Sequence, residues 1–236
     1  SFETLPKMSV PSLPVTSVST PTNVQDTTSA NHANQQIEGI QLRQLADRQH
    51  QVYLPAGMAL DLNGYVKGWC AMQLAENISR VHDWHIPCLV DMGGDIAIGV
   101  PKNPTDKPVS WGVAVAKPYF ANSEHVHNDE DVAILKLSSG AVATSGQDYR
   151  RWLHDGRWQH HLIHPHDLRP VTSDVLTATV LAKDAMTAEV YAKYCVLLGV
   201  KAAVAWLNKH HIAALLIDRD NKVMVTSAMR PNLLAS

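Results

Sequence analysis

Residues 88–100 read CLVDMGGDIAIGV, and this stretch decides the fold. Cys88–Met92 is a short apolar run, the glycines at 93–94 are a turn signal, and Ile96–Val100 is a second apolar run. Two such runs around paired glycines predict two buried strands that pair with each other through a tight turn. Glycine also permits positive φ values, or a close approach of the backbone to a ligand, at this turn.

Helices are expected on both sides of this stretch. Apolar residues recur every four positions from Val66 to Ile78, which predicts a helix with one apolar face. A second helix is expected to begin at a cap on Asp184 and to run to Leu198, where Gly199 ends it. A third helix is expected at residues 202–209.

Further strands are predicted from short apolar or β-branched runs at residues 52–54, 58–62, 111–116, 132–137, 141–144, 175–182, 212–217 and 223–226. Pro55–Gly57 predicts a turn between the first two, and residues 138–140 predict a hairpin between 132–137 and 141–144. Residues 119–131 are polar and predict a loop. Antiparallel strands interspersed with helices predict an α+β domain of layered antiparallel or mixed sheets.

The composition limits the classes of protein to which the chain can belong. The chain has 236 residues, of which 45% are hydrophobic and 18% charged, with a formal net charge of −2. No basic segment suggests nucleic-acid binding, and no apolar run approaches the ~18 residues of a membrane span. Residues 1–10 lack the basic and apolar regions of a signal peptide. Residues 1–36 are rich in Ser, Thr, Pro, Asn and Gln and predict a polar extended segment or linker before a domain at 37–236.

Cysteine use predicts no disulfide framework. Cys70, Cys88 and Cys195 are an odd number at wide spacing, each in apolar surroundings. Three buried thiols that act as small hydrophobic side chains are expected.

Histidines are concentrated in one segment, since five of the 13 lie between residues 154 and 166. Taken alone, His161, His164, His166 and Asp167 suggest a site for a divalent transition metal such as zinc. Neighbouring side chains on an extended segment point to opposite faces, so His160 and His161 are not expected to share one site. Solvated or core histidines explain the same cluster.

Two glycine-containing turns carry residues suited to an anionic ligand. Residues 61–68 read DLNGYVKG and place Lys67 at the start of a predicted helix, where a phosphate is favoured. Asp91 and Asp95 flank the glycine pair at 93–94. A plain turn with solvated carboxylates explains the second pattern equally, and a structural turn explains the first.

Two other segments have the same ambiguity. Ser145 and Gly146 can hydrogen-bond a flat heterocycle or a phosphate, or they simply end a hairpin. Glu189 and Lys193 are spaced i, i+4 on a predicted helix, which favours an ion pair between them.

In this order, these segments resemble the flavin transferase family (ApbE-type, FAD:protein FMN transferase). The matching segments are DLNGYVKG at 61–68, GGDI at 93–96, WGVAVAKP at 111–118, ATSGQDY at 143–149, HLIHPHDLRPV at 161–171 and DAMTAEVYAK at 184–193. The resemblance extends from about residue 37 to the C-terminus. The family's N-terminal strand and helices, which supply flavin contacts, have no recognisable counterpart in residues 1–36.

The resemblance implies an enzyme that cleaves FAD and attaches FMN through a phosphoester bond to a Thr or Ser of an acceptor flavoprotein, with Mg²⁺ as cofactor. It implies action in the periplasm or cell envelope. His161 and Lys67 are expected at the reaction centre. FAD contacts are expected at Asp61, Asn63, Gly64, Lys67, Gly93, Gly94, Asp95, Ser145, Gly146 and His161. Metal ligation is expected at the backbone carbonyl of Val66 and at the side chains of positions 189 and 193.

Six residues depart from the family pattern, of which Asn63 and Val66 replace a Gly and an Ala. Glu189 replaces a ligating Asp, and Lys193 replaces a ligating Thr, although an ammonium has no lone pair to give. Lys193 can instead neutralise phosphate without metal. His164 and Leu168 replace an Asp and a Gly. Three hypotheses therefore remain open: an active FMN transferase, a flavin-binding homologue that no longer transfers, and a histidine-based metal-binding domain.

Overall fold

The computed structural model describes residues 39–45, 49–80, 86–102, 109–118, 130–165 and 168–234. The predicted polar segment at 1–36 lies outside them, as does most of the loop predicted at 119–131. Within the described residues, no helix has the length and apolar character needed to cross a bilayer.

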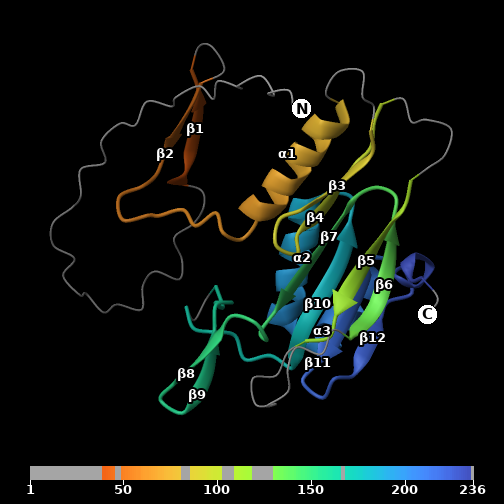
Figure 1. Cartoon of the computed structure of the whole chain (residues 1–236). Helices are drawn as coiled ribbons and strands as arrows, with labels where there is room; N and C mark the ends of the chain where they lie inside the picture. Colours follow the sequence, from red (N-terminus) through yellow and green to blue (C-terminus); the bar gives the residue numbers. More distant parts are fainter. Residues whose placement is uncertain are drawn as a thin grey trace, which may run out of the picture. The chain divides into compact units, whose positions relative to one another are not determined.

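The centre of the fold is a six-stranded sheet in which every neighbouring pair is antiparallel (Figure 1). Its strands run in the order β12 (Val223–Val225), β11 (Ala213–Asp218), β10 (Val175–Ala182), β7 (Ala141–Gly146), β4 (Ile96–Gly99) and β3 (Cys88–Asp91). The predicted pairing around the glycine turn is confirmed, with Cys88 opposite Gly99 and Asp91 opposite Ile96.

Three helices cover one face of this sheet. The helix α1 (Val66–Arg80) packs on β3 and β4, α2 (Ala185–Leu198) packs on β7 and β10, and α3 (Val200–Lys209) packs on β11. All three were predicted as helices, but the apolar face predicted for α1 is wrong. Leu74 and Ile78 are exposed, whereas the buried face is made of the small residues Gly68, Ala71, Ala75 and Ser79, because the helix packs closely on its neighbours. Asp184 caps α2 as expected, because its Oδ1 accepts a hydrogen bond of 2.8 Å from Thr187 N.

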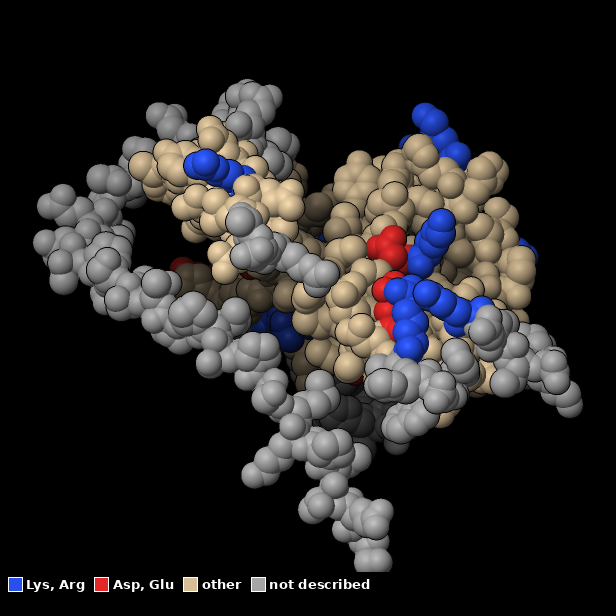
Figure 2. Space-filling view, turned by 90° about the horizontal axis from the view of Figure 1, so that it is seen from above, with Lys and Arg blue, Asp and Glu red and all other residues tan. Residues whose placement is uncertain are grey.

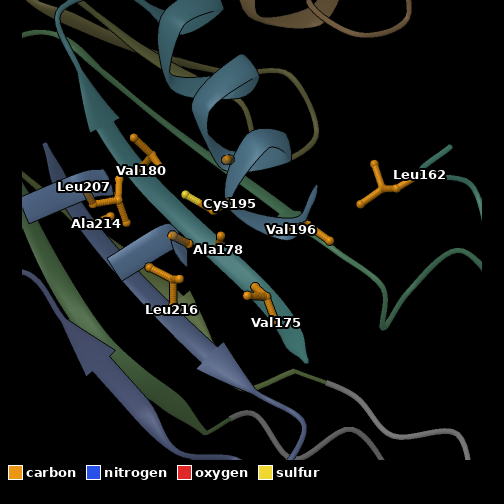
Figure 3. Packing of buried hydrophobic residues seen from close by; sticks show 11 residues of the cluster. Leu162, Val175, Ala178, Val180, Cys195, Val196, Leu207, Ala214 and Leu216 are labelled. Carbon is orange, nitrogen blue, oxygen red and sulfur yellow. The ribbon is translucent and has the colours of Figure 1, made fainter. Parts of the chain in front are cut away.

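The core lies on both faces of the central strands. On the helical side, Ala178 and Val180 of β10 and Leu216 of β11 pack against Cys195 and Leu207 (Figure 3). Alternate residues of a strand point to opposite faces, so Leu215 and Ile217 belong to a second cluster.

The second cluster is covered by a two-stranded sheet of β5 (Trp111–Ala116) and β6 (Asp131–Leu137), through Val113, Val115, Leu135 and Leu137. Helices, six-stranded sheet and two-stranded sheet therefore form three layers. This arrangement confirms the α+β class predicted from the sequence.

The hairpin predicted between residues 132–137 and 141–144 is wrong. Both segments are strands, but β6 pairs with β5, whereas β7 pairs with β4 and β10. The turn at Ser138–Gly140 passes from one sheet to the other, because apolar residues of both strands face the shared second cluster.

Two smaller hairpins complete the described chain. β1 (Gln41–Gln44) pairs with β2 (His50–Tyr53), and β8 (Arg151–His154) pairs with β9 (Arg157–His160). The strand predicted at 58–62 is wrong, since these residues form no regular structure after the confirmed turn at Pro55–Gly57. A short 3₁₀ helix, η4 (Arg230–Asn232), lies near the C-terminus.

All three cysteines are free, as predicted, but only Cys195 is fully buried. Burial raises the pKa of the Cys195 thiol to about 12, so it stays protonated at neutral pH. Cys70 and Cys88 are half-buried.

Candidate functional site

The N-terminus of α1 meets α2 at a glycine. Gly68 N donates a hydrogen bond of 3.3 Å to Glu189 Oε2. A Cβ atom at position 68 would lie 2.9 Å from the carbonyl oxygen of Ala185 and 3.1 Å from Glu189 Oε2. The close approach of the two helices therefore requires glycine here. Glu189 also satisfies a backbone donor at the start of α1, where a negative charge is favoured.

The neighbouring residue, Lys67, reaches the turn between β3 and β4. Its Nζ lies 2.6 Å from Asp95 Oδ2, with the lysine side chain 41% exposed and the aspartate 2% exposed. Asp95 Oδ2 is buried and accepts no hydrogen bond of good geometry. Its ion pair with Lys67 is therefore the contact that offsets the cost of burying its charge. Burial raises the pKa of Asp95, and the Lys67 ammonium opposes that rise.

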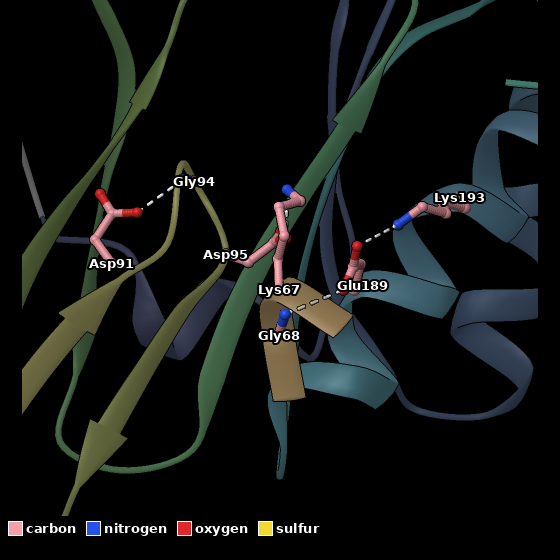
Figure 4. Close-up of polar contacts among 7 residues, drawn as sticks. All are labelled: Lys67, Gly68, Asp91, Gly94, Asp95, Glu189 and Lys193. Atoms are coloured by element: carbon pink, nitrogen blue, oxygen red, sulfur yellow. Dashed lines mark hydrogen bonds and ion pairs between the residues drawn. The ribbon is translucent and has the colours of Figure 1, made fainter. Parts of the chain in front are cut away.

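The turn that carries Asp95 is fixed by backbone geometry. Gly93 and Gly94 have φ values of 71° and 93°, which lie in the region that favours glycine. Asp91 Oδ1 accepts a hydrogen bond of 2.7 Å from Gly94 N, and Met92 N donates to Asp95 O at 3.0 Å. Asp91 therefore shapes the turn, while Asp95 points toward Lys67 (Figure 4).

A second ion pair lies on α2. Lys193 Nζ is 2.7 Å from Glu189 Oε1, which confirms the pair expected from i, i+4 spacing. Glu189 is 1% exposed and Lys193 is 26% exposed. A surface pair was the simpler sequence interpretation, but the carboxylate of this pair is buried.

These two ion pairs are electrostatically coupled. The charge of Glu189 raises the pKa of Asp95, and the charges of both lysines lower it, although burial remains the largest influence. Two buried carboxylates thus lie behind two partly exposed ammonium groups, which we call the four-charge cluster: Lys67, Asp95, Glu189 and Lys193. Figure 2 shows one face of the molecule, on which a few Lys, Arg, Asp and Glu side chains interrupt a largely uncharged surface. Asp95 and Glu189 are buried and do not account for the acidic side chains seen there.

His161 is exposed and lies within electrostatic range of this cluster. Desolvation lowers the pKa of His161, a backbone hydrogen bond involving Arg150 opposes that effect, and the charges of Arg150, His160 and Lys193 lower the pKa further. The imidazole is therefore favoured in its neutral form, which can accept a proton.

His160 has a structural role and is buried, whereas His161 is exposed. His160 is 5% exposed. Its Nδ1 accepts from Leu162 N at 3.2 Å, so its Nε2 carries the proton and donates to Val171 O at 2.7 Å. Both ring nitrogens of His160 are occupied by these contacts, so His160 is not available to a ligand.

The predicted histidine metal site is not assembled among the described residues, which exclude His166 and Asp167. In that part of the chain, no group of three or more His, Cys, Asp or Glu side chains is arranged to hold a metal ion.

The Mg²⁺ position implied by the family resemblance does not fit either. Glu189 Oε1 is bound by the Lys193 ammonium and Oε2 by Gly68 N. A protonated lysine cannot be a ligand. Of the expected ligand set, only the carbonyl of Val66 and the carboxylate of Glu189 are oxygen donors, and that carboxylate already binds Lys193 and Gly68.

The remaining expected FAD contacts fall into two groups. Ser145 is buried and Gly146 half-buried on β7, next to β10. Asp61 and Asn63 form an exposed turn before α1, in which Asn63 N donates to Asp61 Oδ1 at 2.8 Å. Gly64 is in open space, with nothing within 4 Å of a Cβ built there. Among the described residues, no hydrogen bond or ion pair joins this turn to the four-charge cluster.

One residue that positions the β7 segment was not predicted. Gln147 is 5% exposed, and its Nε2 donates to Val175 O at 2.6 Å and to Ser173 O at 3.2 Å. Its Oε1 accepts from Arg219 at 3.0 Å. Gln147 thereby holds Ser145 and Gly146 against the start of β10. Its position directly after the Ser-Gly pair was the available signal.

A hollow of about 200 Å³ lies apart from these residues. It is lined by Lys136, Leu137, Ser138, Ser139, Ala141, Leu181, Ala182 and Asn232, none of which was predicted to bind a ligand. The candidate site is therefore defined by its charged side chains and not by this hollow.

We expect Gly68→Ala to lower the free energy of unfolding by about 1–3 kcal/mol, because the new methyl group meets the Ala185 backbone. The loss outweighs the gain of about 1 kcal/mol that alanine brings to a helix interior. Gly64→Ala is the matched control for stability, since open space surrounds that position. Equal urea midpoints for the two variants would contradict the close contact between α1 and α2.

Comparisons with known proteins identify the family of the chain. The family model described as "ApbE family" matches residues 14–216, which begins earlier than the resemblance expected from about residue 37. The chain is 29% identical over 189 residues to a Treponema pallidum protein named FAD:protein FMN transferase, covering 76% of this chain and 49% of that protein. It is 30% identical over 171 residues to a Haemophilus influenzae protein of the same name, covering 72% and 46%.

Solved structures give the same result for the fold. The ApbE protein from Thermotoga maritima superposes with a TM-score of 0.67 at 23% identity, covering 84% of this chain and 60% of that one. The flavin transferase ApbE from Vibrio cholerae gives 0.59 at 26% identity, covering 84% and 59%. The chain thus spans about half the length of the curated relatives it matches. Because the family model matches most of its residues, the chain belongs to the ApbE family.

Proposed function

We propose that this chain binds FAD and transfers its FMN half to a Thr or Ser hydroxyl of an acceptor protein. The relatives named FAD:protein FMN transferase support this proposal. The observation that carries it is the four-charge cluster, in which Lys67 and Lys193 are partly exposed above the buried Asp95 and Glu189. Two ammonium groups held in place suit the two phosphates of a dinucleotide.

In the proposed reaction, the acceptor hydroxyl oxygen forms a bond to the phosphorus of the FMN half. The bond from that phosphorus to the bridging oxygen breaks, and AMP leaves. Negative charge develops on the phosphate oxygens and on the leaving group. Lys67 stabilises this charge, and Asp95 holds the Lys67 ammonium in place from a buried position.

The hydroxyl proton also needs an acceptor. His161 is favoured in its neutral form, because desolvation and the surrounding positive charges lower its pKa. Its exposure leaves the ring accessible to an incoming side chain. We therefore assign the proton-accepting role to His161 within this proposal.

The first test is whether the purified chain binds FAD, measured by quenching of flavin fluorescence. The second is whether AMP is released and a candidate acceptor peptide gains the mass of one FMN. FAD binding without either product would identify a flavin-binding homologue. No FAD binding at millimolar ligand would reject the proposed function.

We expect His161→Ala to retain FAD binding but to release AMP about a hundredfold more slowly, because the proton acceptor is lost. His154→Ala is the matched control, since its side chain is 70% exposed at the end of β8 and pairs only loosely with Asp155 at 3.5 Å. AMP release by His161→Ala at the rate of the His154→Ala control would remove His161 from the reaction.

A further inference from the structure

We infer that Lys193 supplies, through its own ammonium group, the positive charge that allows this site to hold a pyrophosphate without a metal ion. The inference deepens the proposed function and rests on it for the identity of FAD as the ligand. It begins from the disagreement between the metal position that the resemblance implies and the contacts present there.

The carboxylate of Glu189 is fully used. One oxygen lies 2.7 Å from Lys193 Nζ, and the other accepts from Gly68 N at 3.3 Å. Because Glu189 is only 1% exposed, an incoming cation would have to displace either the ammonium or the contact between α1 and α2. If the ammonium stayed in place, the incoming cation and the ammonium would share one carboxylate and repel each other, which is electrostatically unfavourable.

Lys193 is oriented to serve a ligand as well as Glu189. Its ammonium faces the Glu189 carboxylate (Figure 4), and its side chain is 26% exposed, whereas Glu189 is 1% exposed. An ammonium has three donors, and Glu189 Oε1 takes one of them in the described part of the chain. Two donors can therefore reach phosphate oxygens while the ion pair stays intact.

Lys67 repeats this arrangement on the other side of the cluster. Its ammonium, 41% exposed, is held 2.6 Å from the buried Asp95. The two lysines are linked through Glu189, because one of its oxygens accepts from Lys193 Nζ and the other from Gly68 N, the residue that follows Lys67 on α1. A pyrophosphate carries two adjacent anionic phosphates, and the two partly exposed cations match that charge pattern. The buried carboxylates orient the cations from behind and are farther from a ligand than the ammonium groups are.

The experiment measures binding of FAD and of inorganic pyrophosphate by calorimetry, in EDTA and in excess Mg²⁺. We expect the dissociation constant of each to differ by less than about threefold between the two conditions. Lys193→Met should weaken both by about tenfold or more in EDTA, which corresponds to about 1.4 kcal/mol. Lys201→Met, which removes one exposed lysine from α3, is the control for net charge.

A second variant tests the same position by gain of metal dependence. Lys193→Thr combined with Glu189→Asp restores two oxygen ligands, so binding of pyrophosphate should become at least tenfold tighter in Mg²⁺ than in EDTA. Urea unfolding of each variant shows whether it is folded.

The outcomes separate this inference from the proposed function. Tenfold tighter binding to the unmodified chain in Mg²⁺ than in EDTA overturns the inference but leaves the function standing. So does an equal loss in Lys193→Met and Lys201→Met. Metal-independent binding of pyrophosphate without binding of FAD supports the anion site and rejects the function. Binding of neither ligand rejects both.

Discussion

Replacing Lys67 with methionine is expected to lower the free energy of unfolding at pH 7 by about 3 kcal/mol. Asp95 is 2% exposed, and Lys67 is its ion-pair partner at 2.6 Å, so the substitution leaves a buried carboxylate uncompensated. This loss lies at the lower end of the losses known for broken buried ion pairs, because Lys67 is 41% exposed and Asp95 can take up a proton. Urea unfolding followed by tryptophan fluorescence measures the loss.

The loss should depend on pH in a defined direction. Burial raises the pKa of Asp95 above its ordinary value, and Lys67 opposes that rise. The folded state therefore binds the proton more tightly than the unfolded state, so stability falls as pH rises from the ordinary pKa to the folded pKa. Lys67→Met raises the pKa of Asp95 in the folded state further, so the pH range over which stability falls becomes wider. The difference in the free energy of unfolding between Lys67→Met and the unsubstituted protein should be small near pH 4 and should grow toward pH 7.

Two controls make the result specific to burial. Lys117→Met breaks an ion pair of similar length, 2.8 Å to Glu130, whose side chains are 47% and 60% exposed. It should cost no more than about 0.5 kcal/mol. Adding Asp95→Asn to Lys67→Met removes the uncompensated charge and should restore part of the loss. The burial argument fails if Lys67→Met costs the same amount at pH 4 and pH 7.

Local patterns predicted the elements that local forces determine. The helix at Val66–Arg80, the glycine turn at 93–94 and the cap at Asp184 all depend on residues within a few positions of one another. The ion pair of Glu189 and Lys193 was also accessible, because four residues separate them on one helix. The turn at Asp155–Gly156 was a usable hairpin signal that went unrecognised, and both residues have positive φ.

Contacts between distant segments could not be predicted in this way. Lys67 and Asp95 lie on a helix and a turn that meet only when α1 packs on β3 and β4. The need for glycine at position 68 comes from the backbone of Ala185, which no local pattern reveals. The corner at Ser138–Gly140 has the composition of a hairpin turn, and only packing between the two sheets separates its strands.

The packing of α1 on the sheet supports a final prediction, that Gly99→Ala lowers the free energy of unfolding by about 3 kcal/mol. A methyl group at position 99 of β4 would overlap the carbonyl oxygen of Ala75 and would lie 2.6 Å from Cys88 Sγ. Ala75 is in α1 and is 1% exposed, so the helix and the strand are already in direct contact there. The substitution must push α1 away from β4.

Gly112→Ala is the matched control, because it also adds a methyl group to a strand glycine. That methyl would contact only side chains, Ile134 Cγ2 at 3.4 Å and Leu234 Cδ1 at 3.8 Å, so a change within about 0.5 kcal/mol is expected. Amide hydrogen exchange provides a second measurement, with α1 expected to lose more protection than α3 in Gly99→Ala. Equal unfolding energies for the two variants would contradict the contact.

A second substitution should restore only part of the stability that is lost in Gly99→Ala. Cys88→Ala removes the Sγ atom next to position 99, but the Ala75 carbonyl oxygen belongs to the backbone of α1 and cannot be trimmed. The double variant should therefore recover only part of the loss seen in Gly99→Ala. Since α1 also carries Lys67 and Gly68, a displaced helix should weaken FAD binding as well, even though Gly99 is not a residue of the four-charge cluster. Unchanged FAD affinity in a destabilised Gly99→Ala protein would separate the position of α1 from ligand binding.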